Sequence, residues 1–243
     1  MEEQSENQIE RQEESLSFFS KLGLVFSNPT RLFQNLKQRP EWLLPVIVII
    51  VISMISTFLI TDLILDSRIE ILEMNEQLTD QQKELQIEGT KKFFGSTVGK
   101  IVTATVFPIF GTFILVLVVA AAFLFTGNVV LGGSSTFKHM LTVASWGYLV
   151  SIVESIVKIP LMLAKGSIHV YTSLAVLFDT SEFNTVLFKV ADAFDVFVIW
   201  RIIVWAIGFG IMYKFSNNKS LAAIIALAIV YFAISIGFGS LFS

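Results

Sequence analysis

The sequence predicts an all-α, polytopic membrane protein, in which five transmembrane helices form a bundle preceded by N-terminal amphipathic helices. Of the 243 residues, 54% are apolar, and the mean hydropathy is +0.73. A helix needs about 20 apolar residues to cross a hydrocarbon core of roughly 30 Å. Three uncharged runs have that length, and two further runs carry isolated charges. We therefore expect a transmembrane domain over residues 42–243, with spans at about 42–64, 99–126, 139–164, 194–213 and 219–241.

Residues 1–15, which read MEEQSENQIERQEES, hold six Glu and one Arg. A signal peptide has a basic start and an apolar core, and this segment has neither. Such a composition is typical of a disordered, solvated acidic tail. The net charge of the whole chain is −3, which argues against a nucleic-acid partner. The chain has no Cys, which excludes disulfides and thiolate chemistry.

Residues 16–41 predict two short amphipathic helices. Phe and Leu recur at helical spacing with basic residues between them, and Pro29 separates the two helices. Apolar and basic faces on one helix are typical of a helix in the headgroup region of a membrane. We favour this interfacial position, and packing against the transmembrane bundle is the alternative. The expected membrane-interface residues are Phe18, Phe19, Lys21, Phe26, Arg31, Lys37 and Arg39.

The distribution of basic residues predicts the topology. Four basic residues precede the first span, and Arg68 alone follows it closely. Because cytoplasmic segments are enriched in Lys and Arg, this bias places the N-terminus in the cytoplasm. Over the other loops, the numbers of Lys and Arg expected on the two sides of the membrane are nearly equal. Five spans then leave the C-terminus outside, and we expect the protein in the plasma membrane.

The loops carry local signals of their own. The outer loop 66–94 is rich in acidic residues, and Thr79 caps a helical segment, so the first two spans are expected to extend outward as a polar hairpin. The glycines Gly127, Gly132 and Gly133 allow a tight reversal between the second and third spans. The segment YTSLAVLF is too short to span, and we expect an interfacial or re-entrant helix there.

No pattern of catalytic or metal-ligating residues is found in the sequence. His139 and His169 are predicted on opposite sides of the membrane, so they cannot share a zinc or nucleophilic site. Intramembrane aspartyl catalysis needs two carboxylates at one depth. The candidates Asp62, Asp192 and Asp195 lie near predicted helix ends; Asp192 and Asp195 share a helix face, and capping of the fourth helix explains both. We therefore expect a protein that is not an enzyme and that binds no metal or cofactor.

Three charged residues lie inside predicted spans, where ionisable groups are costly and face the bundle or a cavity. At 1.5 Å per residue, Glu154 in the third span and Arg201 in the fourth each lie roughly 4 Å to the outer side of the middle. We expect them to pair between antiparallel helices, with Lys158 sharing the carboxylate or extending outward. A structural clamp is the favoured interpretation of this intramembrane polar cluster. A polar cavity for ions, lipid headgroups or amphipathic peptides is the alternative.

Small residues four apart recur in the last two spans, as in Ala206 with Gly210 and Ala233 with Gly237. Such pairs allow helices to approach closely. They suit internal packing, which we favour, or contact with a partner helix.

Four segments follow one order along the chain: NPTRLFQNLKQRPEWLLP, GGSSTFKHMLTVASWGY, SLAVLFDTSEFNTVLFKVADAFDVFVIW and SNNKSLAAIIAL. Together they resemble the Yip-one (Ypt-interacting protein) family, and its bacterial branch in particular, over about residues 26–243. The positions that carry the resemblance are Pro29, Phe33, Trp42, Pro45, Gly132, Gly133, Phe137, Gly147, Tyr148, Asp195, Phe197 and Trp200.

This resemblance implies five transmembrane helices and a cytoplasmic N-terminus. Eukaryotic relatives act in Golgi vesicle traffic with small GTPases and other family members. Their Asp-Leu-Tyr-Gly-Pro motif is absent here, which argues against GTPase binding, whereas their Gly-Tyr motif is matched by Gly147 and Tyr148. Some bacterial members accompany membrane export systems.

From these observations we expect a non-enzymatic membrane adaptor or scaffold, which organises the membrane or partner membrane proteins. The alternative is a transport component, or an accessory subunit of an exporter for lipids or membrane-active peptides. Pro108 and Pro160 are single and unpaired rather than part of an inverted repeat, which favours the adaptor. The expected partners are membrane lipids and other integral membrane proteins, such as an ABC-type exporter or a second copy of the chain.

Overall fold

The computed structural model describes residues 16–178 and 185–241, and every regular element within these ranges is a helix. Four helices are long and apolar enough to cross a membrane, and a bent pair makes a fifth span if its two halves count as one. The predicted all-α, polytopic membrane fold is therefore confirmed. The expected acidic tail, residues 1–15, lies outside the described residues.

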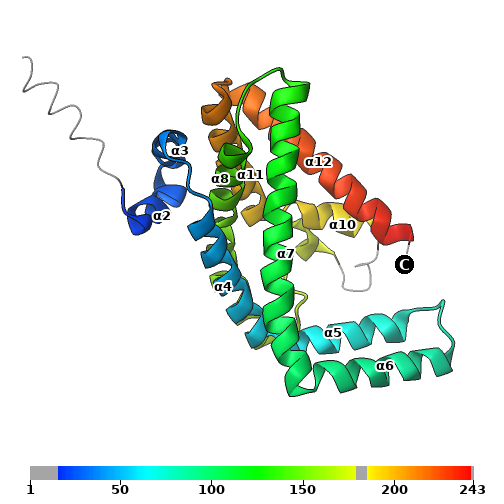
Figure 1. The fold of residues 1–243 in the computed structure, drawn as a ribbon. Helices are drawn as coiled ribbons and strands as arrows, with labels where there is room; N and C mark the ends of the chain where they lie inside the picture. Colours follow the sequence, from blue (N-terminus) through cyan, green and yellow to red (C-terminus); the bar gives the residue numbers. More distant parts are fainter. Residues whose placement is uncertain (1–15, 179–184, 242–243) are drawn as a thin grey trace, which may run out of the picture.

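The bundle is built around one long helix, α7, which runs its full height (Figure 1). α7 packs along α4 and α8, while α11 packs along α3, α8 and α12. The core lies where α3, α8 and α11 meet, because Phe33, Trp146 and Phe209 are all fully buried there. The bounds of the bundle helices are α4 Leu43–Leu59, α7 Thr97–Phe125, α8 Phe137–Tyr148, α9 Val150–Lys165, α11 Val196–Tyr213 and α12 Asn217–Leu241.

The segments expected to be the second to fifth spans coincide closely with α7, α8 with α9, α11, and α12. Within the third of these segments, α8 and α9 follow one another across a single residue, Leu149. Each segment is bounded by polar or glycine-rich turns, so the length of a mostly apolar run was a sufficient signal, even where the run carries isolated charges.

The first expected span, residues 42–64, is not a straight helix, because the chain bends near its C-terminal end. α4 stops at Leu59, and α5 (Thr61–Met74) leaves it at an angle of 67°. At the bend the Thr61 hydroxyl donates to the Thr57 carbonyl over 2.6 Å. The new direction brings Asp62 to Lys100 at the start of α7, with 2.7 Å between Oδ1 and Nζ. Asp62, which follows the apolar run directly, therefore lies on α5 and not on the axis of α4.

α5 and α6 (Asp80–Phe94) form the predicted polar hairpin, which projects sideways from one end of the bundle (Figure 1). Thr79 caps α6 as expected: its hydroxyl accepts from the Gln82 backbone N–H, and the Gln82 side chain accepts from the Thr79 N–H. This reciprocal capping satisfies two backbone donors at the start of the helix.

The two N-terminal helices, α2 (Phe18–Ser27) and α3 (Pro29–Gln38), pack on the bundle with their apolar faces. Asn28 begins α3 by accepting from the Arg31 backbone N–H, and Pro29 occupies the first turn. Phe33 lies against Gly208 of α11 so closely that a Cβ at Gly208 would come within 2.8 Å of the phenyl ring. The apolar face of these helices therefore packs against the bundle, which was the alternative to an interfacial position.

This packing corrects the interfacial interpretation for part of the expected set. Lys21 is only 4% exposed and pairs with Glu41 at 2.7 Å, so it is not available to lipid phosphates. Phe18 and Phe26 contact the rings of Trp146 and Trp200. Sequence periodicity showed that one face was apolar, but not what covered it.

The remaining members of the expected interface differ in exposure. Lys37 donates to the Ile211 carbonyl, and burial, followed by the charge of Lys214, lowers its pKa. Phe19 is 81% exposed, and Arg31 and Arg39 are exposed as well. These three side chains are the part of the set that remains free to meet a membrane surface.

The glycine-rich reversal between α7 and α8 has the predicted tight geometry. It begins with a π-helical turn, Thr126–Val130, and Gly132 adopts a φ of +67°, which favours glycine. Gly127 and Gly133 lie against the Tyr213 ring, where a Cβ would approach within 2.1 and 2.6 Å. In the segment YTSLAVLF, the expected helix is a single 3₁₀ turn, Leu174–Leu177.

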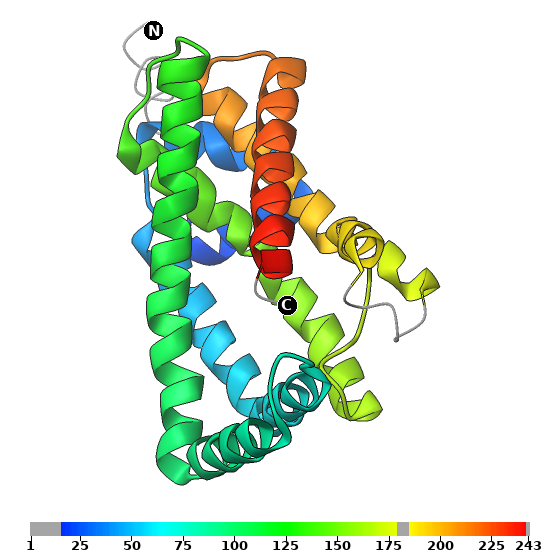
Figure 2. The same cartoon turned by 90° about the vertical axis from the view of Figure 1, so that its right-hand side faces the viewer.

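The bundle has two distinct ends (Figure 2). The turn after α7 and the turn between α11 and α12 lie at one end, and the α5–α6 hairpin lies at the other. α3 is tied to the first end, since the Lys37 backbone carbonyl accepts from the His139 ring and its side chain contacts α11. The segments expected in the cytoplasm thus share one end of the molecule.

Candidate functional site

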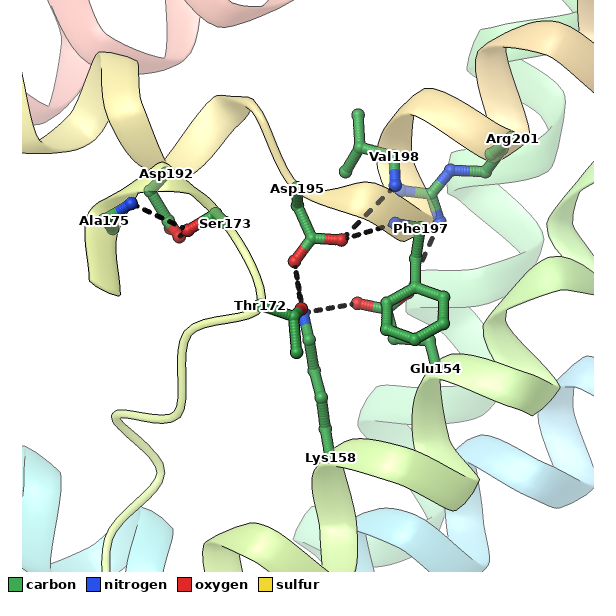
Figure 3. A network of polar contacts seen from close by, with 10 residues as sticks. All are labelled: Glu154, Lys158, Thr172, Ser173, Ala175, Asp192, Asp195, Phe197, Val198 and Arg201. Atoms are coloured by element: carbon green, nitrogen blue, oxygen red, sulfur yellow. Dashed lines mark hydrogen bonds and ion pairs between the residues drawn. The ribbon is translucent and has the colours of Figure 1, made fainter. Parts of the chain in front are cut away.

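Four charged side chains meet between α9 and the start of α11 (Figure 3). Glu154 and Lys158 lie one turn apart on α9, Asp195 precedes the first residue of α11, and Arg201 lies in its second turn. The Lys158 ammonium donates to Glu154 Oε1 at 2.8 Å and to Asp195 Oδ2 at 3.0 Å. These four residues are called the polar cluster below.

Asp195 is the most buried member of the polar cluster, at 4% exposure. As the N-cap of α11 it accepts from the backbone N–H groups of Phe197 and Val198, so the predicted capping role is present. Its second oxygen accepts from Lys158 and, at 2.5 Å, from the Thr172 hydroxyl. The carboxylate therefore joins three segments of the chain: α9, the loop before the 3₁₀ turn, and α11.

Arg201 is brought near Glu154 as the depth argument predicted, but not as the closest partner. Arg201 Nη1 is 4.0 Å from Glu154 Oε2, whereas Lys158 contacts Oε1 directly. The guanidinium also lies over the rings of Tyr148 and Trp205, at 5.2 and 5.6 Å from their centroids. Such cation–π contacts contribute about 0.5–2 kcal/mol each, depending on desolvation.

Asp192 does not share a helix with Asp195, contrary to the expectation that both lie on the fourth helix. It belongs to a separate short helix, α10 (Val186–Ala193), and it accepts from the Ser173 hydroxyl at 2.7 Å. The chain breaks at Phe194 before α11 begins. Although they lie on different helices, the two carboxylates accept from neighbouring hydroxyls of one loop, Ser173 and Thr172.

An apolar cavity of about 290 Å³ adjoins the polar cluster. Its walls come from α7, α8, α11 and α12, and Arg201 is its charged lining residue, next to Tyr148 and Trp205. A second, more polar pocket of about 410 Å³ shares the walls Val198 and Phe232 and reaches Lys158, Asp192 and Asp195. The polar cluster thus borders two pockets, of which the one that reaches Lys158, Asp192 and Asp195 is the more polar.

The positions that carried the family resemblance are spread through the fold rather than gathered in one site. Several occupy contacts between helices: Gly147 meets the indole of Trp205, where a Cβ would lie within 2.2 Å, and Trp42 contacts Phe113. Asp195 belongs to the polar cluster, and Tyr148 and Phe197 contact it, since their rings lie beside Arg201 and Lys158. Pro45, Phe137, Phe197 and Trp200 lie within or beside α4, α8 and α11.

Sequence reasoning missed two partners in this site. Lys158 was expected to share Glu154 or to extend outward, yet it also binds Asp195. The helix rise that placed Glu154 level with Arg201 could also have predicted this pair. Lys158 follows Glu154 by four residues and Asp195 precedes Arg201 by six. Because the helices are antiparallel, both steps run toward the same end of the bundle. Thr172 lies in an irregular loop and gave no such signal.

No group of three or more His, Asp or Glu side chains suited to a metal ion occurs within residues 16–178 and 185–241. His139 is bound to Thr136 and to the Lys37 carbonyl near α3. His169 lies beside Ser67, Glu70 and Tyr171 near the α5–α6 hairpin. The two imidazoles are therefore at different ends of the bundle.

An all-α bundle with several apolar spans and a charged cluster between two of them defines a multi-pass membrane protein. The Yip1 domain model matches residues 23–239, nearly the whole chain. The protein belongs to the Yip1 domain family. No curated protein and no solved structure matches the chain significantly.

Proposed function

We propose that this protein is a non-enzymatic integral membrane adaptor or scaffold, from the bacterial branch of its family. The observation that carries the proposal is the mutual engagement of the polar cluster. Asp195 accepts from Lys158, Thr172 and two backbone N–H groups, and Glu154 accepts from Lys158. Carboxylates bound in this way fix the register of helices, a role for which buried polar groups are well suited.

The surface that would receive a partner is the outward face of α12. This helix packs mainly along α11 and touches α10. Ala206 and Gly210 of α11 are buried, and a Cβ at Gly210 would lie 2.7 Å from Ser220 Oγ of α12, which supports internal packing for that pair. Ala226 and Ala233 of α12 are exposed instead. Small exposed residues on a membrane helix permit a second helix to pack closely.

The experiment is a mild-detergent pull-down of the full chain, followed by mass spectrometry. We expect an integral membrane protein at stoichiometric amount with the wild type, and a loss of that protein with Ala233→Phe. The matched control is Ile114→Phe, on an exposed position of α7. Equal capture of the partner by both variants would exclude the outward face of α12 as the binding surface. A stoichiometric ATP-driven exporter among the partners would favour the transport-accessory alternative.

The proposed location is the plasma membrane, with the N-terminus in the cytoplasm and the C-terminus outside. The basic residues ahead of α4 support this orientation, and the segments expected on the cytoplasmic side all lie at one end of the bundle (Figure 2). Phe19, Arg31 and Arg39 would then face the inner leaflet. Single cysteines replacing Ser5 and Ser243 should react with membrane-impermeant reagents from opposite sides. Reaction from the same side would exclude an odd number of spans.

A further inference from the structure

Arg201 differs from the other members of the polar cluster, each of which makes a hydrogen bond to another member. Lys158 donates to both carboxylates, and Asp195 is bound by Lys158, Thr172 and the backbone. Arg201 Nη1 is 4.0 Å from Glu154, beyond hydrogen-bond distance. Across the described ranges, its guanidinium donates no hydrogen bond. Since a guanidinium carries five N–H donors, Arg201 can bind a further anion.

The surroundings of Arg201 favour a ligand that is mostly apolar. The guanidinium lines the cavity of about 290 Å³, and it is held there against Tyr148 and Trp205. The other walls include Leu115 and Leu227, from α7 and α12. An ion pair formed in such a site is poorly screened, so a single cation there discriminates strongly between charged and neutral ligands.

The cavity is open between α7 and α12. Val118 on α7 and Tyr231 on α12 both line it, and they are 59% and 60% exposed. Both helices are candidate membrane spans, so this opening faces the region where lipid chains lie. A ligand with an acyl chain could enter sideways from the hydrocarbon core, with its chain passing between the two helices.

The depth of Arg201 and the size of the cavity limit the headgroup. Arg201 is the sixth residue of the eighteen-residue helix α11, so it lies roughly 7–8 Å inside the end of the span. The cavity volume is close to the lower limit, about 300 Å³, of ordinary ligand pockets. A glycerophosphate headgroup at this depth would need more room. A carboxylate is compact, and it matches the fork of a guanidinium with two parallel hydrogen bonds.

We infer that the cavity between α7, α11 and α12 binds a fatty-acid anion, whose carboxylate is held by Arg201 and whose acyl chain leaves between α7 and α12. This inference does not depend on the scaffold proposal. A scaffold that fails to capture a partner would still bind the acid, and a protein that does not bind the acid would still be able to organise partners.

The test uses the full-length protein in detergent and a dibrominated stearate as the probe. Bromine quenches indole fluorescence on contact, and Trp205 lines the cavity. We expect saturable quenching by the acid and much weaker quenching by its methyl ester, which has the same chain and no charge. Arg201→Gln should weaken the apparent affinity by about tenfold or more, the value of a lost charge-assisted hydrogen bond.

A second variant leaves all four charges in place. Ala228 lines the cavity, so Ala228→Phe should fill it and abolish saturable quenching. Ala226→Phe is the matched control, because Ala226 lies on the same helix, is exposed and does not line the cavity. That variant should bind the acid as the wild type does. The pair separates loss of the site from a general disturbance of α12.

Three results would overturn the inference. Equal quenching by the acid and the ester would show that the cavity accepts lipid chains without regard to charge. Unchanged affinity in Arg201→Gln would remove the proposed anion contact. The third is an absence of saturable quenching in the wild type together with capture of a protein by a photoreactive group at position 228, which would assign the cavity to a partner's transmembrane helix.

Discussion

Two ion pairs in this protein have nearly the same geometry and different surroundings. Lys158 and Asp195 are 3.0 Å apart, with side chains 18% and 6% exposed. Lys100 and Asp62, at the bend between α4 and α5, are 2.7 Å apart, with side chains 37% and 75% exposed. The shorter pair is the more exposed one.

We expect burial, rather than distance, to decide what each pair contributes to stability. An exposed pair is screened by water and is worth about 0–1 kcal/mol. Removing one partner of a buried pair costs about 3–5 kcal/mol, because the remaining charge stays in a medium that solvates it poorly. The polar cluster should therefore respond strongly to single substitutions, and the pair at the bend of α4 and α5 weakly.

The largest effect is expected for Asp195→Ala. This change removes the partner of Lys158, the acceptor of Thr172 and the N-cap of α11. We expect a loss of about 3–5 kcal/mol in the free energy of unfolding, measured by thermal unfolding in detergent. Asp195→Asn should lose less, since Asn also caps helices well and keeps an acceptor for Thr172.

Asp192→Ala is the control for that series. Asp192 is exposed and accepts a hydrogen bond from Ser173, so its removal should cost about 1 kcal/mol or less. Equal losses for Asp192→Ala and Asp195→Ala would mean that burial does not distinguish these carboxylates, and the comparison would fail.

The next largest effect is expected for Glu154→Leu. It leaves Arg201 with ring contacts alone, and an arginine has no accessible neutral form. A charge at the centre of a span costs roughly 2.5–3.5 kcal/mol, so the loss should approach that range. Arg201→Leu should cost less, because Glu154 keeps its bond to Lys158.

The double variant tests whether the two residues act together. Glu154→Leu with Arg201→Leu should be more stable than the sum of the single losses predicts, by about 0.5 kcal/mol or more. The comparison of melting curves for all four proteins gives this coupling directly. Simple additivity would show that the 4.0 Å separation carries no interaction.

An intermediate case is the pair of Lys21 and Glu41, which joins a buried cation to a carboxylate that is 46% exposed. The two deletions should therefore be unequal. Glu41→Ala strands the Lys21 ammonium and should cost about 1–3 kcal/mol, whereas Lys21→Met leaves a carboxylate that water can reach. Unfolding of both variants by the same probe gives the difference. A larger loss for Lys21→Met would reverse the role assigned to burial.

Much of the fold could be predicted because the membrane imposes a length on each apolar run. The uncharged stretch from Ile101 to Phe125 leaves few alternatives to a span. The bend after Leu59 could not be found in this way, since Ile60 and Thr61 continue the uncharged run beyond it. The packing of Phe33 on Gly208 joins residues far apart in sequence, and no local pattern identifies such a contact.

The polar cluster was partly predictable for the same reason. Charges at depth are rare, so Glu154, Lys158 and Arg201 were conspicuous, and the helix rise placed two of them at one level. Asp195 was interpreted only as a cap, because it lies at a helix end where capping is a sufficient explanation. The cavity beside Arg201 depends on how four helices diverge, which hydropathy does not record.

The smallest effect is expected for Asp62→Asn, which removes the exposed pair at the bend. The variant should lose about 0–1 kcal/mol, since both side chains can be hydrated once the pair is broken. The difference from the wild type should shrink as salt is added, because exposed charges are screened over a Debye length of about 8–10 Å at physiological ionic strength. Thermal unfolding at low and high salt measures both quantities. Asn keeps a similar shape at position 62, so a large, salt-independent loss would mean that the carboxylate sets the bend between α4 and α5, and the weaker of the two ion pairs would then be the one that shapes the fold.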